Sequence, residues 1–436
     1  MHRRHLLAVA GSVTLFDTAG CATNACSPSE TDAVDPPPTA WLRPRYGPTN
    51  AGAPTSGKRR PTERAPPDDP ATAWTYDVPD DGVTSAPVVA DGTVYVATGL
   101  PDRSRQERTD GSLFAIDPET GTENWSSVLP KGATGPPTIA GNQVVVGARD
   151  GILRGFDTDG KLQWRIGFDS APNTPAVVGD MAYLTTVNGT VRAAELGSSD
   201  ACWTHSQMRP RDHLGFGRTY FSEAKPAVTD GVVYAATATS SSSEGRDIQH
   251  SRLLAIDAET GERRWQYWFD ADEPPRTPAV RDGVVYVAGG DALHAVNVAS
   301  GERRWSFATG YRTSSAPAIA DGTVYCSSKN VYALDAETGD EQWRHVNEAI
   351  SGTRNHDDVT ALTNAPTVVG NTVYVAFGAL DAETGEKEWG EFGNRTDSEY
   401  YYLTDRDAAA AGGPALADGA AFVTATYGTV HRFGDA

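Results

Sequence analysis

The 436-residue chain lacks the short motifs that identify several common enzyme classes. It contains no H-E-x-x-H zinc motif, no G-x-S-x-G nucleophile elbow, no C-x-x-C-H haem attachment motif and no glycine-rich phosphate loop. Its only extended apolar stretch near the N-terminus is too short to cross a bilayer as a helix. These absences argue against a zinc peptidase, a serine hydrolase, a c-type cytochrome and a P-loop nucleotide enzyme.

Lysine is scarce, with six Lys beside 31 Arg, and the formal net charge is -20. An acidic protein repels the phosphate backbone, so we expect no nucleic-acid partner. Abundant Asp and Glu with little Lys resemble the proteins of salt-loving archaea, in which salt screens the repulsion between acidic surface groups. An ordinary acidic secreted protein is the alternative explanation.

Four cysteines are too few for a disulfide scaffold. Cys21 and Cys26 precede the folded part of the chain. Cys202 and Cys326 fall in the third and sixth copies of a repeat described below, which places them on different sides of a closed ring. Cysteines with Cα atoms more than about 7 Å apart cannot bridge, so we predict that both are free.

The first 21 residues have the character of an export signal. A charged start precedes a short apolar stretch from Leu6 to Phe16, and small residues follow. Arg3-Arg4 resembles a twin-arginine signal, and Ala19-Gly20-Cys21 resembles the end of a lipobox. We therefore predict a signal peptide over 1–20, lipidation of Cys21 and a location on the extracellular side of the cell membrane.

Residues 21–70 are rich in Pro, Ser, Thr, Gly and charge. Such a segment cannot bury enough apolar surface to order itself. We predict a disordered tether that holds a folded domain, residues 71–436, away from the membrane.

A phrase made of a strand ending in Asp, a Thr-Gly turn and a Trp recurs about every forty residues. The copy over 277–309 shows the whole unit, in which alternating apolar residues and tight Gly-containing turns mark four antiparallel strands. Four such strands are the unit of a propeller blade. Eight copies predict eight Trp wedges between blades, at Trp74, Trp125, Trp164, Trp203, Trp265, Trp305, Trp343 and Trp389.

The last copy ends after its third strand, while the segment ATAWTYDV, which contains Trp74, supplies a fourth strand at the other end. The predicted fold is therefore all-β, an eight-bladed β-propeller of four-stranded antiparallel blades. Its ring is closed by the N-terminal strand pairing into the C-terminal blade, which removes an open sheet edge.

The repeated A-x-D-x-x-T-G-x-x-x-W motif resembles the PQQ-like β-propeller repeat family over about residues 71–436. The resemblance implies one of two branches: quinoprotein alcohol dehydrogenases, which bind pyrroloquinoline quinone and Ca²⁺ on the propeller axis, or non-catalytic members that include a lipoprotein of the outer-membrane assembly machinery. The enzymes usually carry adjacent cysteines, a calcium cluster and an Asp base, and this chain has no Cys-Cys pair. We expect the non-catalytic branch, without a cofactor or metal.

Five insertions interrupt the repeat, at 100–112, 204–224, 240–251, 347–363 and 391–412. All five fall in connections between the second and third strands or between successive blades, which emerge on one face. Long loops on a rigid scaffold are where binding residues concentrate. The predicted binding residues are Arg211, His213, Arg218, Tyr220, His250, Arg354, His356, Asp357, Tyr401 and Arg406.

Aromatic residues mixed with arginine are typical of protein or carbohydrate recognition. We expect a protein partner or a surface polysaccharide, with solvated loops as the alternative. A metal site formed by His213, His250 and His356 is disfavoured because these residues lack ligand spacing. The sequence therefore predicts an exported, membrane-tethered binding or assembly scaffold.

Overall fold

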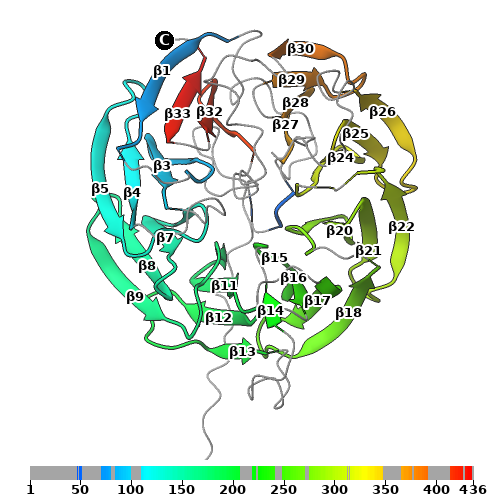
Figure 1. Ribbon diagram of the computed structural model, residues 1–436, viewed down its shortest axis with the longest axis horizontal. Helices are drawn as coiled ribbons and strands as arrows, with labels where there is room; N and C mark the ends of the chain where they lie inside the picture. Colours follow the sequence, from blue (N-terminus) through cyan, green and yellow to red (C-terminus); the bar gives the residue numbers. More distant parts are fainter. Residues whose placement is uncertain are drawn as a thin grey trace, which may run out of the picture.

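Strand is the only regular secondary structure in the described residues. The computed structural model describes residues 47, 49–51, 70–79, 84–99, 110–206, 219–221, 224–240, 248–270, 274–311, 313, 315–346, 365–375, 378–390, 413–425 and 428–434. Eight antiparallel sheets surround a central axis, as Figure 1 shows. The predicted eight-bladed propeller is confirmed.

Each blade runs outward from an innermost strand of three residues to an outer strand of three to seven residues, and blades are numbered 1 to 8 along the chain. The innermost strands are β2 (Val88–Ala90), β6 (Thr138–Ala140), β10 (Ala176–Val178), β15 (Ala227–Thr229), β19 (Ala279–Arg281), β23 (Ala318–Ala320), β27 (Thr367–Val369) and β31 (Ala415–Ala417). The second strands are β3 (Thr93–Ala97), β7 (Gln143–Gly147), β11 (Met181–Thr185), β16 (Val232–Ser240), β20 (Val284–Gly289), β24 (Thr323–Ser327), β28 (Thr372–Val375) and β32 (Ala420–Ala425).

The outer half of each blade carries the repeated phrase. The third strands are β4 (Gly111–Ile116), β8 (Ile152–Asp157), β12 (Val191–Glu195), β17 (Ile248–Asp257), β21 (Ala292–Asn297), β25 (Val331–Asp335), β29 (Gly378–Asp381) and β33 (Thr429–Phe433). The outer strands are β5 (Glu123–Leu129), β9 (Leu162–Gly167), β13 (Trp203–His205), β18 (Arg263–Phe269), β22 (Arg303–Ala308), β26 (Glu341–His345), β30 (Lys387–Gly390) and β1 (Thr72–Asp77). An additional strand, β14 (Thr219–Phe221), belongs to blade 4.

The ring closes as the sequence predicts. β1 is the outer strand of blade 8 and pairs antiparallel with β33, so that Trp74 lies opposite Arg432. Figure 1 shows β1 beside β33 next to the C-terminus. Because a strand from one end of the chain completes the blade at the other end, blade 8 has four strands like its neighbours and β33 is not left as its outermost strand.

The core lies between neighbouring blades. The second strands are buried almost throughout, whereas the outer strands consist mostly of exposed and half-buried residues with an occasional buried one such as Trp305. Seven clusters of buried apolar residues each join adjacent blades, including one that joins blades 5 and 6 around Tyr286 and Trp305. One blade alone cannot bury both its faces, so stability depends on the closed array.

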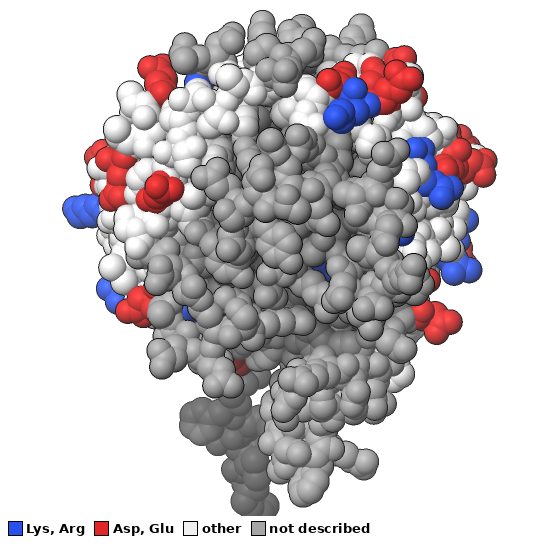
Figure 2. All heavy atoms as spheres, turned by 45° about the horizontal axis from the view of Figure 1, so that its top comes forward, with Lys and Arg blue, Asp and Glu red and all other residues white. Residues whose placement is uncertain are grey.

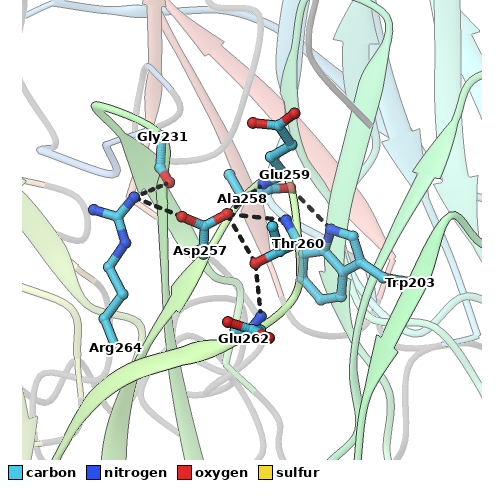
Figure 3. A network of polar contacts seen from close by, with 8 residues as sticks. All are labelled: Trp203, Gly231, Asp257, Ala258, Glu259, Thr260, Glu262 and Arg264. Carbon is cyan, nitrogen blue, oxygen red and sulfur yellow. Dashed lines mark hydrogen bonds and ion pairs between the residues drawn. The ribbon is translucent and has the colours of Figure 1, made fainter. Parts of the chain in front are cut away.

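The Trp of one blade packs on the Thr-Gly turn of the next. In blades 3 and 4, Trp203 Nε1 donates to Ala258 O at 2.8 Å, while its ring lies against Gly261. The Asp257 carboxylate accepts from the backbone N–H of Thr260 and from Arg264, which holds this turn in place (Figure 3).

The same contact recurs around the ring. The indoles of Trp74, Trp125, Trp265, Trp305 and Trp343 each donate to a backbone carbonyl of the following blade. Trp164 differs, because its indole donates to Gln143 of its own blade. Trp389 packs against a cluster that includes residues of blade 8, where the third and outer strands come from opposite ends of the chain. The belt of Trp rings is therefore architecture and not a ligand site.

Two predictions need correction. Residues 49–51 do not behave as part of a disordered tether: Asn50 and Ala51 are buried, and the blue segment lies at the centre of the ring (Figure 1). Hydrogen-bond partners on the axis supply the order that its composition does not predict. Cys202 is disulfide-bonded and not free, and its partner lies outside the described residues. Cys326 is free and buried, and burial raises the pKa of its thiol to about 12.

Among the described residues, no helix is long and apolar enough to cross a bilayer. The predicted signal peptide and the lipidation site at Cys21 lie outside the described residues.

Candidate binding face

One end of the ring carries all the long connections. The turns between the first and second strands contain two residues, as at Asp91-Gly92 and Asp282-Gly283, where both residues have positive φ. By contrast, 13 residues separate β3 from β4 and 24 separate β30 from β31. In an antiparallel blade, the connection between the second and third strands and the connection to the next blade emerge at the same end. We call this end the loop-bearing face.

Most of the predicted binding residues lie outside the described residues. These are Arg211, His213, Arg218, Arg354, His356, Asp357, Tyr401 and Arg406. The backbone of Tyr220 is described as part of β14, and His250 is described in full and is exposed.

Blade 4 brings Tyr220 and His250 to the same place. Its second strand, β16, has nine residues, four more than β3 of blade 1. The additional length pairs on one side with β14 and on the other with β17, so that Tyr220 and His250 both lie in register with Thr239. Blade 4 therefore extends beyond its neighbours at the loop-bearing face.

The outer strand of this extension carries an exposed tryptophan. Trp268 is 46% exposed and lies directly opposite Arg252 in the β17–β18 ladder. The Arg252 guanidinium carbon is 5.1 Å from the centre of the Trp268 ring, and the His250 ring meets the same indole edge-on at 5.5 Å between centroids. We call His250, Arg252 and Trp268 the blade-4 platform.

Our sequence reasoning missed Arg252 and Trp268. The available signal was a second Trp three residues after the repeated one, in RRWQYWF. The corresponding positions in blades 1 and 6 are Val128 and Val346, which are 63% and 51% exposed. Because the side chain at this position faces solvent in these blades, packing of the repeat does not require a large aromatic residue such as Trp268 there. An exposed Trp paired with Arg has the composition of an interaction hot spot.

The opposite side of the same strand is packed against blade 5. Tyr267 and Phe269 flank His294 of β21, with the Tyr267 hydroxyl 3.1 Å from His294 Nδ1. Burial lowers the pKa of His294 to about 4, although the Gly289 carbonyl opposes this shift. His294 therefore remains neutral near pH 7 and serves packing, which gives the platform a rigid base.

Charge is distributed around the outside of the ring. In the view of Figure 2, the Asp and Glu side chains of the described residues lie along its rim, interspersed with Lys and Arg. Several carboxylates belong to the repeated turns, where backbone N–H groups bind them. The N–H of Thr120, for example, lowers the pKa of Asp117. These acidic groups stabilise the turns that carry them.

The described residues do not fit a quinone and calcium on the axis. Asn50 and Ala51 fill the axial position beside blades 4, 5 and 6, through contacts with Pro226, Pro278 and Ile319. In the described ranges, no three His, Cys, Asp or Glu side chains are grouped so as to hold a metal ion. A quinone–calcium pair needs both axial space and a carboxylate-rich ligand set.

Comparison with known proteins identifies relatives of the repeat. A family model described as outer membrane protein assembly factor BamB matches residues 65–249 and 217–436. The serine/threonine-protein kinase AfsK of Streptomyces griseus is 36% identical over 178 residues, which cover 37% of this chain and 21% of that protein. BamB of Bordetella pertussis is 26% identical over 207 residues, which cover 47% of each protein. The chain thus spans about a fifth to a half of these relatives.

Solved structures share the fold at low sequence identity. BamB from Moraxella catarrhalis aligns with a TM-score of 0.55 and 16% identity, over 84% of this chain and 100% of that one. A quinohemoprotein alcohol dehydrogenase from Comamonas testosteroni aligns with a TM-score of 0.62 and 16% identity, over 91% and 81%. Likeness at this level concerns architecture alone, because one propeller fold supports unrelated functions.

Proposed function

The chain belongs to the family described as outer membrane protein assembly factor BamB, and we propose that it acts as an exported, membrane-tethered, non-catalytic scaffold that binds a protein partner through its loop-bearing face. The observation that carries this proposal is the one-sided placement of every long connection, beside uniform two-residue turns between first and second strands. The blade-4 platform places the exposed Trp268 and His250 on that face, with the buried Arg252 against the Trp268 ring.

A protein partner is favoured over a polysaccharide by the make-up of the platform. Trp268 contacts a guanidinium and an imidazole, and Trp and Arg are both enriched at the hot spots of protein interfaces. A membrane tether adds to this by raising the local concentration of the scaffold near a membrane-bound partner.

A capture experiment tests the proposal. The full-length chain is crosslinked to membranes of the producing organism, and bound proteins are quantified by mass spectrometry for three chains. Deletion of residues 391–412 is expected to leave the melting temperature unchanged and to abolish partner recovery. Glu337→Lys, at an exposed turn on the opposite end of the ring, should recover the partner as the unaltered chain does. Equal recovery by the deletion chain would contradict the proposal.

The second candidate is a quinoprotein alcohol dehydrogenase, because the chain is 27% identical over 178 residues to quinohemoprotein alcohol dehydrogenase ADH IIB of Pseudomonas putida, of which these residues cover 23%. The chain is incubated with pyrroloquinoline quinone, Ca²⁺, an artificial electron acceptor and a panel of alcohols. We expect no saturable turnover, and turnover that saturates with one alcohol would replace the scaffold proposal with the enzyme. A glycan array tests a polysaccharide ligand in parallel.

A further inference from the structure

The innermost strands of the blades are edge strands whose free side faces the axis. Such an edge offers N–H and C=O groups to any extended chain that reaches it. In blades 5 and 6, the middle residue of the innermost strand uses this edge. Val280 N donates to Thr49 O and Ile319 N donates to Ala51 O, both at 2.8 Å. Residues 49–51 thus bridge two adjacent blades at the axis, and Asn50 N donates to Gly47 O at 3.1 Å, which closes a turn.

Side-chain contacts add recognition to these backbone bonds. Asn50 Nδ2 donates to Pro226 O at 2.9 Å and to Pro278 O at 3.1 Å, which bridges the starts of the innermost strands of blades 4 and 5. Ala51 is 2% exposed and belongs to the apolar cluster between blades 5 and 6. The axis therefore offers two acceptors for an amide, two N–H donors for a backbone and a pocket for a small side chain. A peptide with matching groups would be recognised through both its backbone and its side chains.

The present occupant fits this site imperfectly. Asn50 is fully buried, yet its Oδ1 atom has no hydrogen-bond partner among the described residues. Its φ of 56° lies in the left-handed region, which costs energy for any residue other than glycine. A segment with these costs is held in place largely because it belongs to the same chain, which gives it a high effective concentration.

We propose that the axial ends of blades 4, 5 and 6 form an acceptor site for a peptide turn that carries Asn followed by a small residue. Thr49–Ala51 fill this site within the chain, and a turn of a partner protein with the same chemistry replaces them. The site is separate from the blade-4 platform and from the long connections, so it stands or falls independently of the loop-bearing face.

The test uses the full-length protein and a fluorescent peptide with the sequence of residues 45–55. Asn50→Gly removes the bridging amide and retains the freedom to adopt positive φ. The peptide is expected to bind the Asn50→Gly chain about tenfold more tightly than the unaltered chain, because the competing segment is weakened. Thr49→Ala is the matched control, since Thr49 contributes its backbone carbonyl and should leave the peptide affinity unchanged. A peptide with Gly in place of Asn50 should bind neither chain.

Amide hydrogen exchange provides a second readout. In the Asn50→Gly chain, the amides of Val280 and Ile319 should exchange faster, and saturating peptide should restore their protection. Ala51→Leu, which overfills the small pocket, serves as an independent variant if Asn50→Gly does not fold. Equal peptide affinity for the variant and unaltered chains, or no restored protection, overturns the proposal. Deletion of residues 391–412 should leave peptide binding intact, which separates this result from failure of the partner-capture proposal.

Discussion

The outer belt and the axis of this propeller follow opposite rules. Along the belt, the Trp of one blade contacts the turn glycine of the next, and the contact recurs from Trp74 on Gly121 to Trp343 on Gly385. At the axis, the contacts of Asn50 with blades 4 and 5 occur once. The blade-4 platform also occurs once. The repeated Trp–Gly contacts hold the ring together. The contacts that occur once, at the axis and at the blade-4 platform, are the candidates for specific binding.

This difference arises from what each region must satisfy. A turn glycine on the belt meets two constraints together, a positive φ and an indole ring packed where a Cβ would lie. Only glycine meets both constraints, so the same residue recurs at this position in successive blades. The exposed position three residues after each repeated Trp has no such constraint, and it holds Val128 in blade 1 and Trp268 in blade 4.

The largest expected effect comes from breaking the belt at a buried ring. Trp305 is 9% exposed, donates to Ala336 O and packs between blades 5 and 6. Trp305→Ala removes this apolar contact and the hydrogen bond, and should lower the free energy of unfolding by about 3–5 kcal/mol. Chemical denaturation followed by tryptophan fluorescence measures the loss. A loss below about 1 kcal/mol would contradict the assignment of the belt as the structural element.

Comparison of two turn glycines separates the cost of a positive φ from the cost of a clash with the packed indole ring. Gly301 and Gly283 have nearly the same φ, 72° and 74°, but a Cβ on Gly301 would lie 2.7 Å from the Trp265 ring, whereas one on Gly283 would meet nothing within 4 Å. Gly301→Ala should therefore destabilise the protein by about 2–4 kcal/mol and Gly283→Ala by about 1 kcal/mol. Thermal unfolding of both variants measures the difference, and equal losses would show that the indole contact contributes little.

The fold is readable from the sequence because its determinants are local and repeated. The Thr-Gly-x-x-x-Trp spacing marks the outer hairpin, and the incomplete last copy predicts closure by the strand that holds Trp74. Repetition lets a weak copy, such as the one ending at Trp164, be recognised from its stronger neighbours.

The axis and the blade-4 platform could not be predicted in the same way. Asn50 lies in a Pro- and Ser-rich segment, and its burial depends on carbonyls of Pro226 and Pro278, more than 170 residues away. Arg252 and Trp268 meet only because their strands pair in register. The disulfide at Cys202 was likewise not evident from the spacing of the cysteines. Contacts between distant, unrepeated residues leave no local signal.

Acid should weaken the packing beneath the blade-4 platform. His294 has an ordinary pKa of 6.5, and burial lowers it to about 4 in the folded protein. The unfolded chain therefore binds more protons between these values, and the stability from neutral His294 is lost as the pH falls from 6.5 to 4, by up to about 3 kcal/mol. His294→Gln should flatten this part of the pH profile of unfolding relative to the unaltered chain. An identical slope in both chains would exclude His294 as its origin.

Substitution of Trp268 should have the smallest effect on folding stability and a large effect on partner binding. Its ring is nearly half exposed and contacts Arg252 and His250, so Trp268→Ala should cost below about 1 kcal/mol of folding free energy. If the platform binds the partner, the same change should weaken partner binding by about 2 kcal/mol or more, which is the range of interface hot spots. Val128→Ala is the matched control, because Val128 occupies the equivalent position opposite Ser112. Loss of stability without loss of binding would assign Trp268 to architecture, and equal binding losses in both variants would remove the distinction between the two blades.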